Sequence, residues 1–162
     1  MRYYRVFNIL TQCEGLESKR KIINRNNDPI EEAENIVKGY KNGPEIIFAP
    51  GRAFYRPATD EISVPHINDY PLPEEYYSTL FHEMGHSTGH KDRLNRSGIE
   101  SLAAFGSDLY SKEELIAEIT SVMLCGVAGI ENKTLDNSAA YIKSWSEKLR
   151  QDSKLKKDLN RI

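Results

Sequence analysis

The chain has few cysteines and no long apolar run. Its 162 residues include only two cysteines, Cys13 and Cys125, which lie far apart in the sequence. Disulfide-stabilised secreted domains are much richer in cysteine, so we expect both residues to be free thiols in a reducing compartment. No segment approaches the roughly 18 apolar residues of a membrane span, and no apolar run typical of a secretion signal follows the N-terminus. These absences predict a cytoplasmic protein without a membrane partner.

A strong excess of charge of one sign is also missing. The formal net charge is -2, and 28% of the residues are charged. Dedicated DNA-binding domains are usually strongly basic, so the composition argues against one here. Basic residues at 19–25 and 148–161 can contact phosphate, but we interpret them as solvated surface. The length fits one domain with its own core, so we treat residues 1–162 as a single domain.

The most informative stretch, residues 76–90, reads YYSTLFHEMGHSTGH. His82 and His86 are four residues apart, so on a helix they share one face, about 6 Å apart along the axis, and can bind one metal ion. Glu83 follows the first histidine, where its carboxylate can reach a water bound to that ion and act as a general base. This HExxH pattern indicates zincin chemistry if the segment is helical.

The surrounding residues favour such a helix. Pro73 suits a first helical turn, Glu74 and Glu75 place negative charge at the positive end of the helix dipole, and Gly89 is a suitable stop. An apolar stripe follows at helical spacing: Tyr77, Leu80, Phe81 and Met84. The alternative is a chance match on an ordinary helix, and the helical context favours metal binding over it.

A catalytic zinc ion needs a third protein ligand and leaves its fourth position to water. His90 is near in sequence, but on a continuing helix it would lie about 12 Å from His82 along the axis. If the chain turns at Gly89, His90 comes four residues after the second histidine, whereas the metzincin pattern requires six. We therefore assign His90 a supporting or structural role.

The better third ligand lies in the segment from Ser111 to Gly126, SKEELIAEITSVMLCG, whose apolar residues recur with helical period. Glu114 and Glu118 stand one turn apart on one side of this second helix. In the gluzincin arrangement, a motif of this spacing supplies first a ligand and then a carboxylate that orients a ligand histidine. We interpret Glu114 as the third ligand and Glu118 as the supporting partner.

One alternative concerns the start of that helix. Ser111 and Glu114 also fit a capping box, in which the glutamate merely closes the first turn. In that case Glu113 or Glu118 becomes the alternative ligand.

The segment before the HExxH motif indicates a small antiparallel sheet. Strand-like runs alternate there with turn signals at residues 45–49, 52–55 and 61–64. Zincins bind extended peptide along a sheet edge above the metal, so DEISVPH, residues 60–66, is the candidate edge. The alternative is a sheet that only supports the active-site helix.

The flanking segments complete an α+β fold. Residues 3–10 read as a strand or extended arm. Asp28 is expected to cap a helix that reaches about Gly39. Residues 137–149 predict an amphipathic helix, and Asp152 caps a short final one.

Other polar residues near the motif are weaker candidates. Tyr110, before the second helix, and Tyr76 or Tyr77 are candidate donors to the oxyanion of a tetrahedral intermediate. With nine tyrosines in the chain, most must be packing residues. Arg93 and Arg96, in the loop between the two helices, either bind a substrate carboxylate or hold the loop in place.

Several separated blocks resemble one known family. YYSTLFHEMGHSTGHKDRLNR, FGSDLYSKEELIAEITSVML and NSAAYIKSWSEKL occur in order, after MRYYRVFNILTQCEGL and AFYRPATDEISVP. Over about residues 1–150 the chain resembles the zincin-like metallopeptidase domain of ArdC-type antirestriction proteins and related polyvalent proteins of mobile elements. The resemblance implies a gluzincin-like fold and a zinc ion carried by His82, His86 and the glutamate of EELIAE, with Glu83 as base. In that family a domain that binds single-stranded DNA precedes this one. We find no such domain in this sequence, and expect DNA only through a separate domain or partner.

The sequence therefore predicts a zinc-dependent peptidase that acts on a peptide or protein substrate, built on a small sheet and two site-bearing helices. The competing hypothesis is a zinc-stabilised module that binds a partner, or assists antirestriction, without cleaving anything. A purely structural zinc site has no need of Glu83, so this residue favours the enzyme.

Overall fold

The structure, a computed structural model, describes residues 14–15, 25–100, 108–130 and 143. The segments expected at 3–10 and 137–149, the cap at Asp152 and Cys13 lie outside these residues. The described chain forms four α-helices, a short 3-10 helix and three strands, in an α+β arrangement. In order they are α2 (Glu31–Gly39), β1 (Glu45–Phe48), β2 (Phe54–Arg56), β3 (Glu61–Val64), η1 (Ile67–Asp69), α3 (Pro73–Ser87), α4 (Ser97–Glu100) and α5 (Asp108–Val127).

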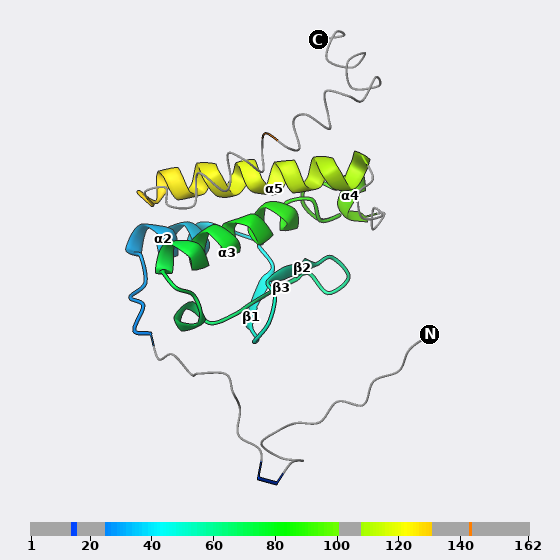
Figure 1. The fold of residues 1–162 in the computed structure, drawn as a ribbon. Coiled ribbons are helices and arrows are strands. Elements are labelled where there is room, and N and C mark those ends of the chain that lie inside the picture. Colours follow the sequence, from blue (N-terminus) through cyan, green and yellow to red (C-terminus); the bar gives the residue numbers. More distant parts are fainter. Residues whose placement is uncertain (1–13, 16–24, 101–107, 131–142, 144–162) are drawn as a thin grey trace.

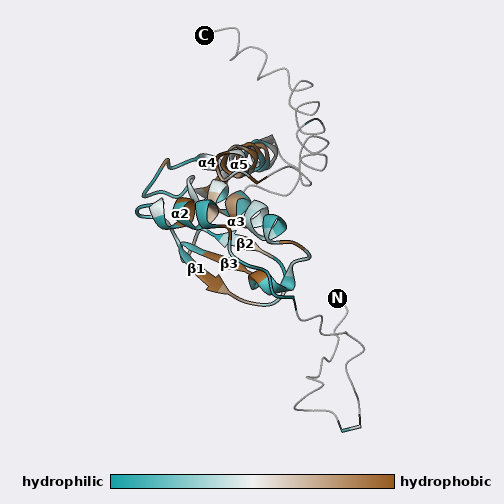
Figure 2. Cartoon of the chain, turned by 90° about the vertical axis from the view of Figure 1, so that its left-hand side faces the viewer, coloured by the Kyte–Doolittle hydropathy of each residue, from teal (hydrophilic) through white to brown (hydrophobic). Residues whose placement is uncertain are grey.

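Helix α3 is the centre of the fold. It lies between α5 on one side and the small sheet on the other, with α2 beside it (Figure 1). Pro73 occupies the first turn, as predicted. The predicted apolar stripe is buried, and it forms one core with sheet residues such as Ile62 and Val64. In the perpendicular view, hydrophobic residues colour the strands and α5 on either side of α3 (Figure 2).

The sheet is mixed, with strand order β1-β3-β2. Strand β2 pairs with β3 in an antiparallel hairpin, whereas β1 pairs with the other side of β3 and runs parallel to it. The prediction of an antiparallel sheet is therefore wrong for β1. Because β3 is the central strand, residues 60–66 are not a free edge, and that prediction is wrong as well. Among the described strands, the edges are β1 and β2.

Two helices begin at different residues from those expected. Helix α2 begins at Glu31 with Ile30 as its N-cap residue, so Asp28 does not cap it. Helix α5 begins at Asp108, which makes Ser111 its fourth residue. The alternative that places Ser111 at the N-terminus of this helix is therefore wrong. None of the described helices is long and apolar enough to cross a membrane.

Candidate metal centre

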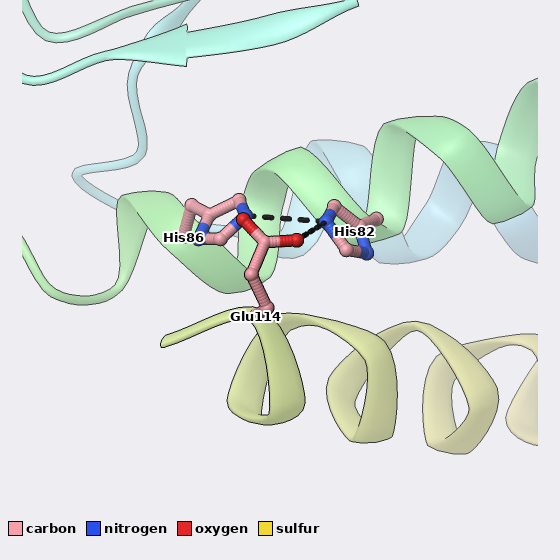
Figure 3. Close-up of side chains that lie close together, drawn as sticks. All are labelled: His82, His86 and Glu114. Carbon is pink, nitrogen blue, oxygen red and sulfur yellow. Dashed lines mark hydrogen bonds and ion pairs between the residues drawn. The ribbon is translucent and has the colours of Figure 1, made fainter. Parts of the chain in front are cut away.

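Three side chains converge between α3 and α5. His82 and His86 project from α3, and Glu114 reaches toward them from α5 (Figure 3). The two Nε2 atoms lie 3.1 Å apart. The Glu114 carboxylate places Oε2 3.8 Å from Nε2 of His82 and Oε1 3.5 Å from Nε2 of His86. One ligand atom from each residue lies within 4.8 Å of the others, so the three can share one ion.

The donor set fits a transition metal such as zinc. Zinc bonds of about 2.0–2.2 Å to histidine and carboxylate place neighbouring ligand atoms of a tetrahedron roughly 3.3–3.6 Å apart. The two Nε2 atoms lie 3.1 Å apart, close to that range. One Glu114 oxygen lies 3.5 Å from Nε2 of His86 and the other lies 3.8 Å from Nε2 of His82, so a single oxygen needs only a small shift to join both. Two imidazoles and one carboxylate also leave the fourth position open, as catalytic rather than structural zinc sites do.

The orientation of His82 is set by Glu118. The carboxylate Oε2 of Glu118 lies 3.1 Å from Nδ1 of His82. Since an ionised carboxylate can only accept, Nδ1 donates the proton and Nε2 is left with its lone pair toward the other two side chains. The Nδ1 atom of His86 is buried and has no hydrogen-bond partner among the described residues.

The two histidines differ in their affinity for protons. Burial alone would lower the pKa of His82, but the hydrogen bond with Glu118 and the charges of Glu83 and Glu114 raise it above its ordinary value. Burial, together with the charges of His82 and Arg96, lowers the pKa of His86 to about 3. A proton therefore competes with a metal ion at His82 and much less at His86.

Glu83 opens onto the same cavity as the three candidate ligands. The cavity has a volume of about 430 Å³ and is lined by α3, β2, α4 and α5. Glu83 is only 9% exposed, and its Oε2 accepts a hydrogen bond of 2.8 Å from the backbone N–H of Tyr55. Burial raises the pKa of Glu83, which the charge of His82 and the Tyr55 N–H partly offset. A carboxylate with a raised pKa beside a metal site has the properties of a general base.

Sequence reasoning missed Tyr55. Tyr55 lies in β2, and its backbone N–H donates to Glu83. A backbone donor of this kind leaves no side-chain motif in the sequence. The only available signal was the position of a short strand-like run before the HExxH helix.

The tyrosines expected near the oxyanion separate into two groups. Tyr110 lines the cavity, and burial together with its hydrogen bond to Glu114 raises its pKa to about 12. Tyr76 and Tyr77 are buried in the core, where the Tyr77 hydroxyl donates to Glu34 over 2.8 Å. The prediction of an oxyanion donor at Tyr76 or Tyr77 is therefore wrong.

The loop after α3 is held by its arginines. Arg96 donates from Nε to both carboxylate oxygens of Glu113 over 3.0 Å, and also to Thr88 and the carbonyl of Gly85. Glu113 thus has a charged partner of its own, which disfavours it as a third ligand. His90 is 6% exposed and its carbonyl accepts from two loop amides, so it is a structural residue of the loop.

Comparison with known proteins places the chain in a family. The model of the zincin-like metallopeptidase family matches residues 31–156, which include the HExxH helix and α5. The chain belongs to that family. The α+β zincin-like fold and the ArdC-type resemblance predicted from the sequence are thereby confirmed.

Individual relatives are consistent with this membership. The chain is 39% identical over 142 residues to a DNA primase TraC of Escherichia coli, covering 87% of this chain and 9% of that protein. It is 33% identical over 153 residues to the uncharacterised protein y4eC of Sinorhizobium fredii, covering 94% of this chain and 48% of that protein. The crystal structure of the antirestriction protein ArdC from plasmid R388, in its Mn(II)-bound form, is 36% identical with a TM-score of 0.58. That match covers 92% of this chain and 53% of ArdC. The chain thus spans about half, or much less, of each of these relatives.

Proposed function

We propose that this chain is a zinc-dependent metallopeptidase that hydrolyses a peptide bond in a peptide or protein substrate, in the cytoplasm and in the setting of a mobile genetic element. The observation that carries the proposal is the placement of Glu83 in one cavity with His82, His86 and Glu114. A site that only stabilises a fold needs ligands, but it does not need a buried carboxylate beside them. Membership of a metallopeptidase-like family supports the same function.

The metal ligands and Glu83 have different roles in the proposed reaction. A zinc ion held by His82, His86 and Glu114 would polarise the scissile carbonyl and make the attacking water more acidic. Glu83 takes one proton from that water as its oxygen bonds to the carbonyl carbon, and then delivers the proton to the amine nitrogen as the C–N bond breaks.

Two further side chains support the reaction. Glu118 keeps the His82 ring in the orientation that presents Nε2. The Tyr110 hydroxyl, with a pKa of about 12, stays protonated at neutral pH. Tyr110 lines the cavity, which supports a role as donor to the developing oxyanion.

Zinc is proposed over manganese on chemical grounds. The ArdC structure is described as Mn(II)-bound, and imidazole with carboxylate can hold either ion. For a given site of nitrogen and oxygen ligands, however, zinc binds more tightly than manganese. A competition titration that loads manganese in preference to zinc would contradict this choice.

The test is cleavage of a diverse peptide mixture by wild type and Glu83→Gln, each loaded with zinc. We expect cleavage by wild type, and a loss of about 10²–10⁴-fold in Glu83→Gln at unchanged metal content, because only the proton transfer is removed. Equal cleavage by both proteins would overturn the role of Glu83. No cleavage by zinc-loaded wild type would favour the zinc-stabilised binding module.

The substrate class and any contact with DNA are also proposals. The relatives are described as an antirestriction protein and a DNA primase, so we place the substrate among proteins that act where DNA of mobile elements is handled. We propose that residues 1–162 act as one zincin-like domain, and that any contact with DNA is made by a separate domain or partner.

A further inference from the structure

Tyr55 donates two hydrogen bonds, one from its backbone N–H and one from its side-chain hydroxyl. Its backbone N–H donates to Oε2 of Glu83 over 2.8 Å, and its hydroxyl donates to Oδ1 of Asp60 over 2.8 Å. It is the middle residue of β2, a three-residue edge strand that pairs only with β3 among the described strands. A strand this short is weakly held by its own ladder. The hydrogen bond from the Tyr55 hydroxyl to Asp60 therefore helps to fix the position of the Tyr55 N–H beside Glu83.

Asp60 is held in turn by Arg93. Nη1 of Arg93 donates to Oδ2 of Asp60 over 2.9 Å, and Nη2 donates to Oδ1. Nη2 also lies 3.3 Å from the hydroxyl of Tyr55. The Arg93 side chain is 12% exposed, so this two-pronged ion pair is shielded from solvent on the arginine side. Asp60 is the last residue of the turn between β2 and β3, so the ion pair ties this turn to Arg93.

The contacts close into a ring on α3. Nε of Arg93 donates to the carbonyl of Ser87 over 2.8 Å, and Ser87 is the last residue of α3. Ser87 stands one helical turn beyond Glu83, to which the Tyr55 N–H returns. The ring thus starts and ends on the helix that carries the candidate base, and it passes through β2 and its turn between these two points.

We propose that Tyr55 is a positioning residue for Glu83. Asp60 and Arg93 hold Tyr55 where its backbone N–H can donate to the Glu83 carboxylate. The inference rests on the proposed function, in which Glu83 is the general base. A general base must be within hydrogen-bond reach of the proton it takes, and small displacements of such a group cost large factors in rate. A donor fixed on the main chain selects one orientation of the Glu83 carboxylate before substrate arrives.

The first test separates positioning from folding. Tyr55→Phe keeps the N–H and removes the hydroxyl, and Asp60→Asn weakens the pair with Arg93. We expect kcat to fall by about tenfold in both variants, with KM and metal content unchanged. Glu61→Gln is the matched control, because Glu61 lies in the same hairpin and pairs with Arg56 over 3.0 Å at the surface. Its kcat should equal that of wild type, and an equal fall in the control would contradict the specific role of Tyr55.

The second test needs no substrate. Hydrogen exchange at the Tyr55 amide, followed by NMR, reports the contact with Glu83 directly, because this N–H donates to the Glu83 carboxylate. We expect protection in wild type and in Glu61→Gln, and protection reduced by at least about tenfold in Tyr55→Phe and in Glu83→Ala. An unprotected amide in wild type, or full protection retained in Tyr55→Phe, would overturn the proposal. Protection that follows the expected pattern while wild type cleaves no peptide would support the contact and contradict the proposed peptidase instead.

Discussion

Nδ1 of His82 lies 3.1 Å from Oε2 of Glu118, on the same helix as Glu114 and one turn beyond it. One helix therefore supplies both the carboxylate that faces the two histidines and the carboxylate that orients one of them. This spacing also explains why α5 must pack on α3 in a single register. A shift of α5 along α3 would displace both contacts together.

Replacing Glu118 should weaken metal binding without abolishing it. Loss of a carboxylate that orients a ligand histidine typically costs about 10–100-fold in metal affinity, and we expect this range for Glu118→Ala. Glu118→Gln should lose less, because the amide oxygen can still accept from Nδ1. Affinities from competition with a chromophoric chelator provide the measurement. Equal, unchanged affinities in both variants would show that Glu118 does not orient His82.

Metal affinity should fall with decreasing pH, and the fall should begin above the range of an ordinary histidine. Because the pKa of His82 is raised, this ring is protonated once the pH falls below that raised value, and a metal ion must then displace the proton to bind. The lowered pKa of His86 keeps that ring neutral over the same pH range. One displaced proton gives a loss of about tenfold per pH unit below the His82 pKa. The chelator titration repeated from about pH 8 to about pH 6 measures it. In Glu118→Gln the fall should begin at lower pH, and an affinity independent of pH would contradict this assignment.

The close approach of the two site helices depends on Gly85. A Cβ atom there would lie 2.8 Å from the Cα of Ala117 on α5, which is too close for backbone to tolerate. Gly85→Ala should therefore destabilise the protein by about 1–3 kcal/mol and weaken metal binding, because α5 carries Glu114. Gly126→Ala is the matched control, since a Cβ there has no atom within 4 Å. The control should stabilise helix α5 slightly, and thermal unfolding of the metal-free proteins compares the two.

Much of the site follows from local sequence. The i, i+4 spacing of His82 and His86 and the apolar stripe between Pro73 and Met84 are properties of a single helix, and α3 forms where they predict it. Glu114 was a choice among three glutamates, and packing favours it. The buried Glu113 is paired with Arg96, and Glu118 contacts Nδ1 of His82, on the other side of the ring from Nε2.

The sheet could not be predicted in the same way. Whether β1 runs parallel or antiparallel to β3 depends on pairing between residues that are 16 apart in the sequence, such as Glu45 and Glu61. No local sequence pattern determines that pairing. The contact from Tyr55 to Glu83 was also invisible, because every residue except proline carries a backbone N–H. The start of α5 was misplaced because Ser111 and Glu114 imitate a capping box inside a helix that begins earlier.

Arg96 should contribute to stability far more than a surface charge. Its ion pair with Glu113 has side chains only 18% and 8% exposed, so Arg96→Ala leaves a buried carboxylate without its partner. We expect a loss of about 3–5 kcal/mol in the free energy of unfolding. Lys38→Ala, which removes an ion pair with Glu34 whose lysine is 71% exposed, should change stability little. Denaturant unfolding tests both, and similar losses in the two variants would contradict the structural role of Arg96.

The central claim is that His82, His86 and Glu114 hold one metal ion. Metal content per chain, measured by elemental analysis after dialysis, tests it most directly in wild type, Glu114→Ala and the control Glu118→Gln, each checked for folding by circular dichroism. The account predicts one zinc ion per folded chain in wild type and in the control, and its loss in Glu114→Ala. Folded wild type without metal, or Glu114→Ala that keeps its full metal content, would contradict it.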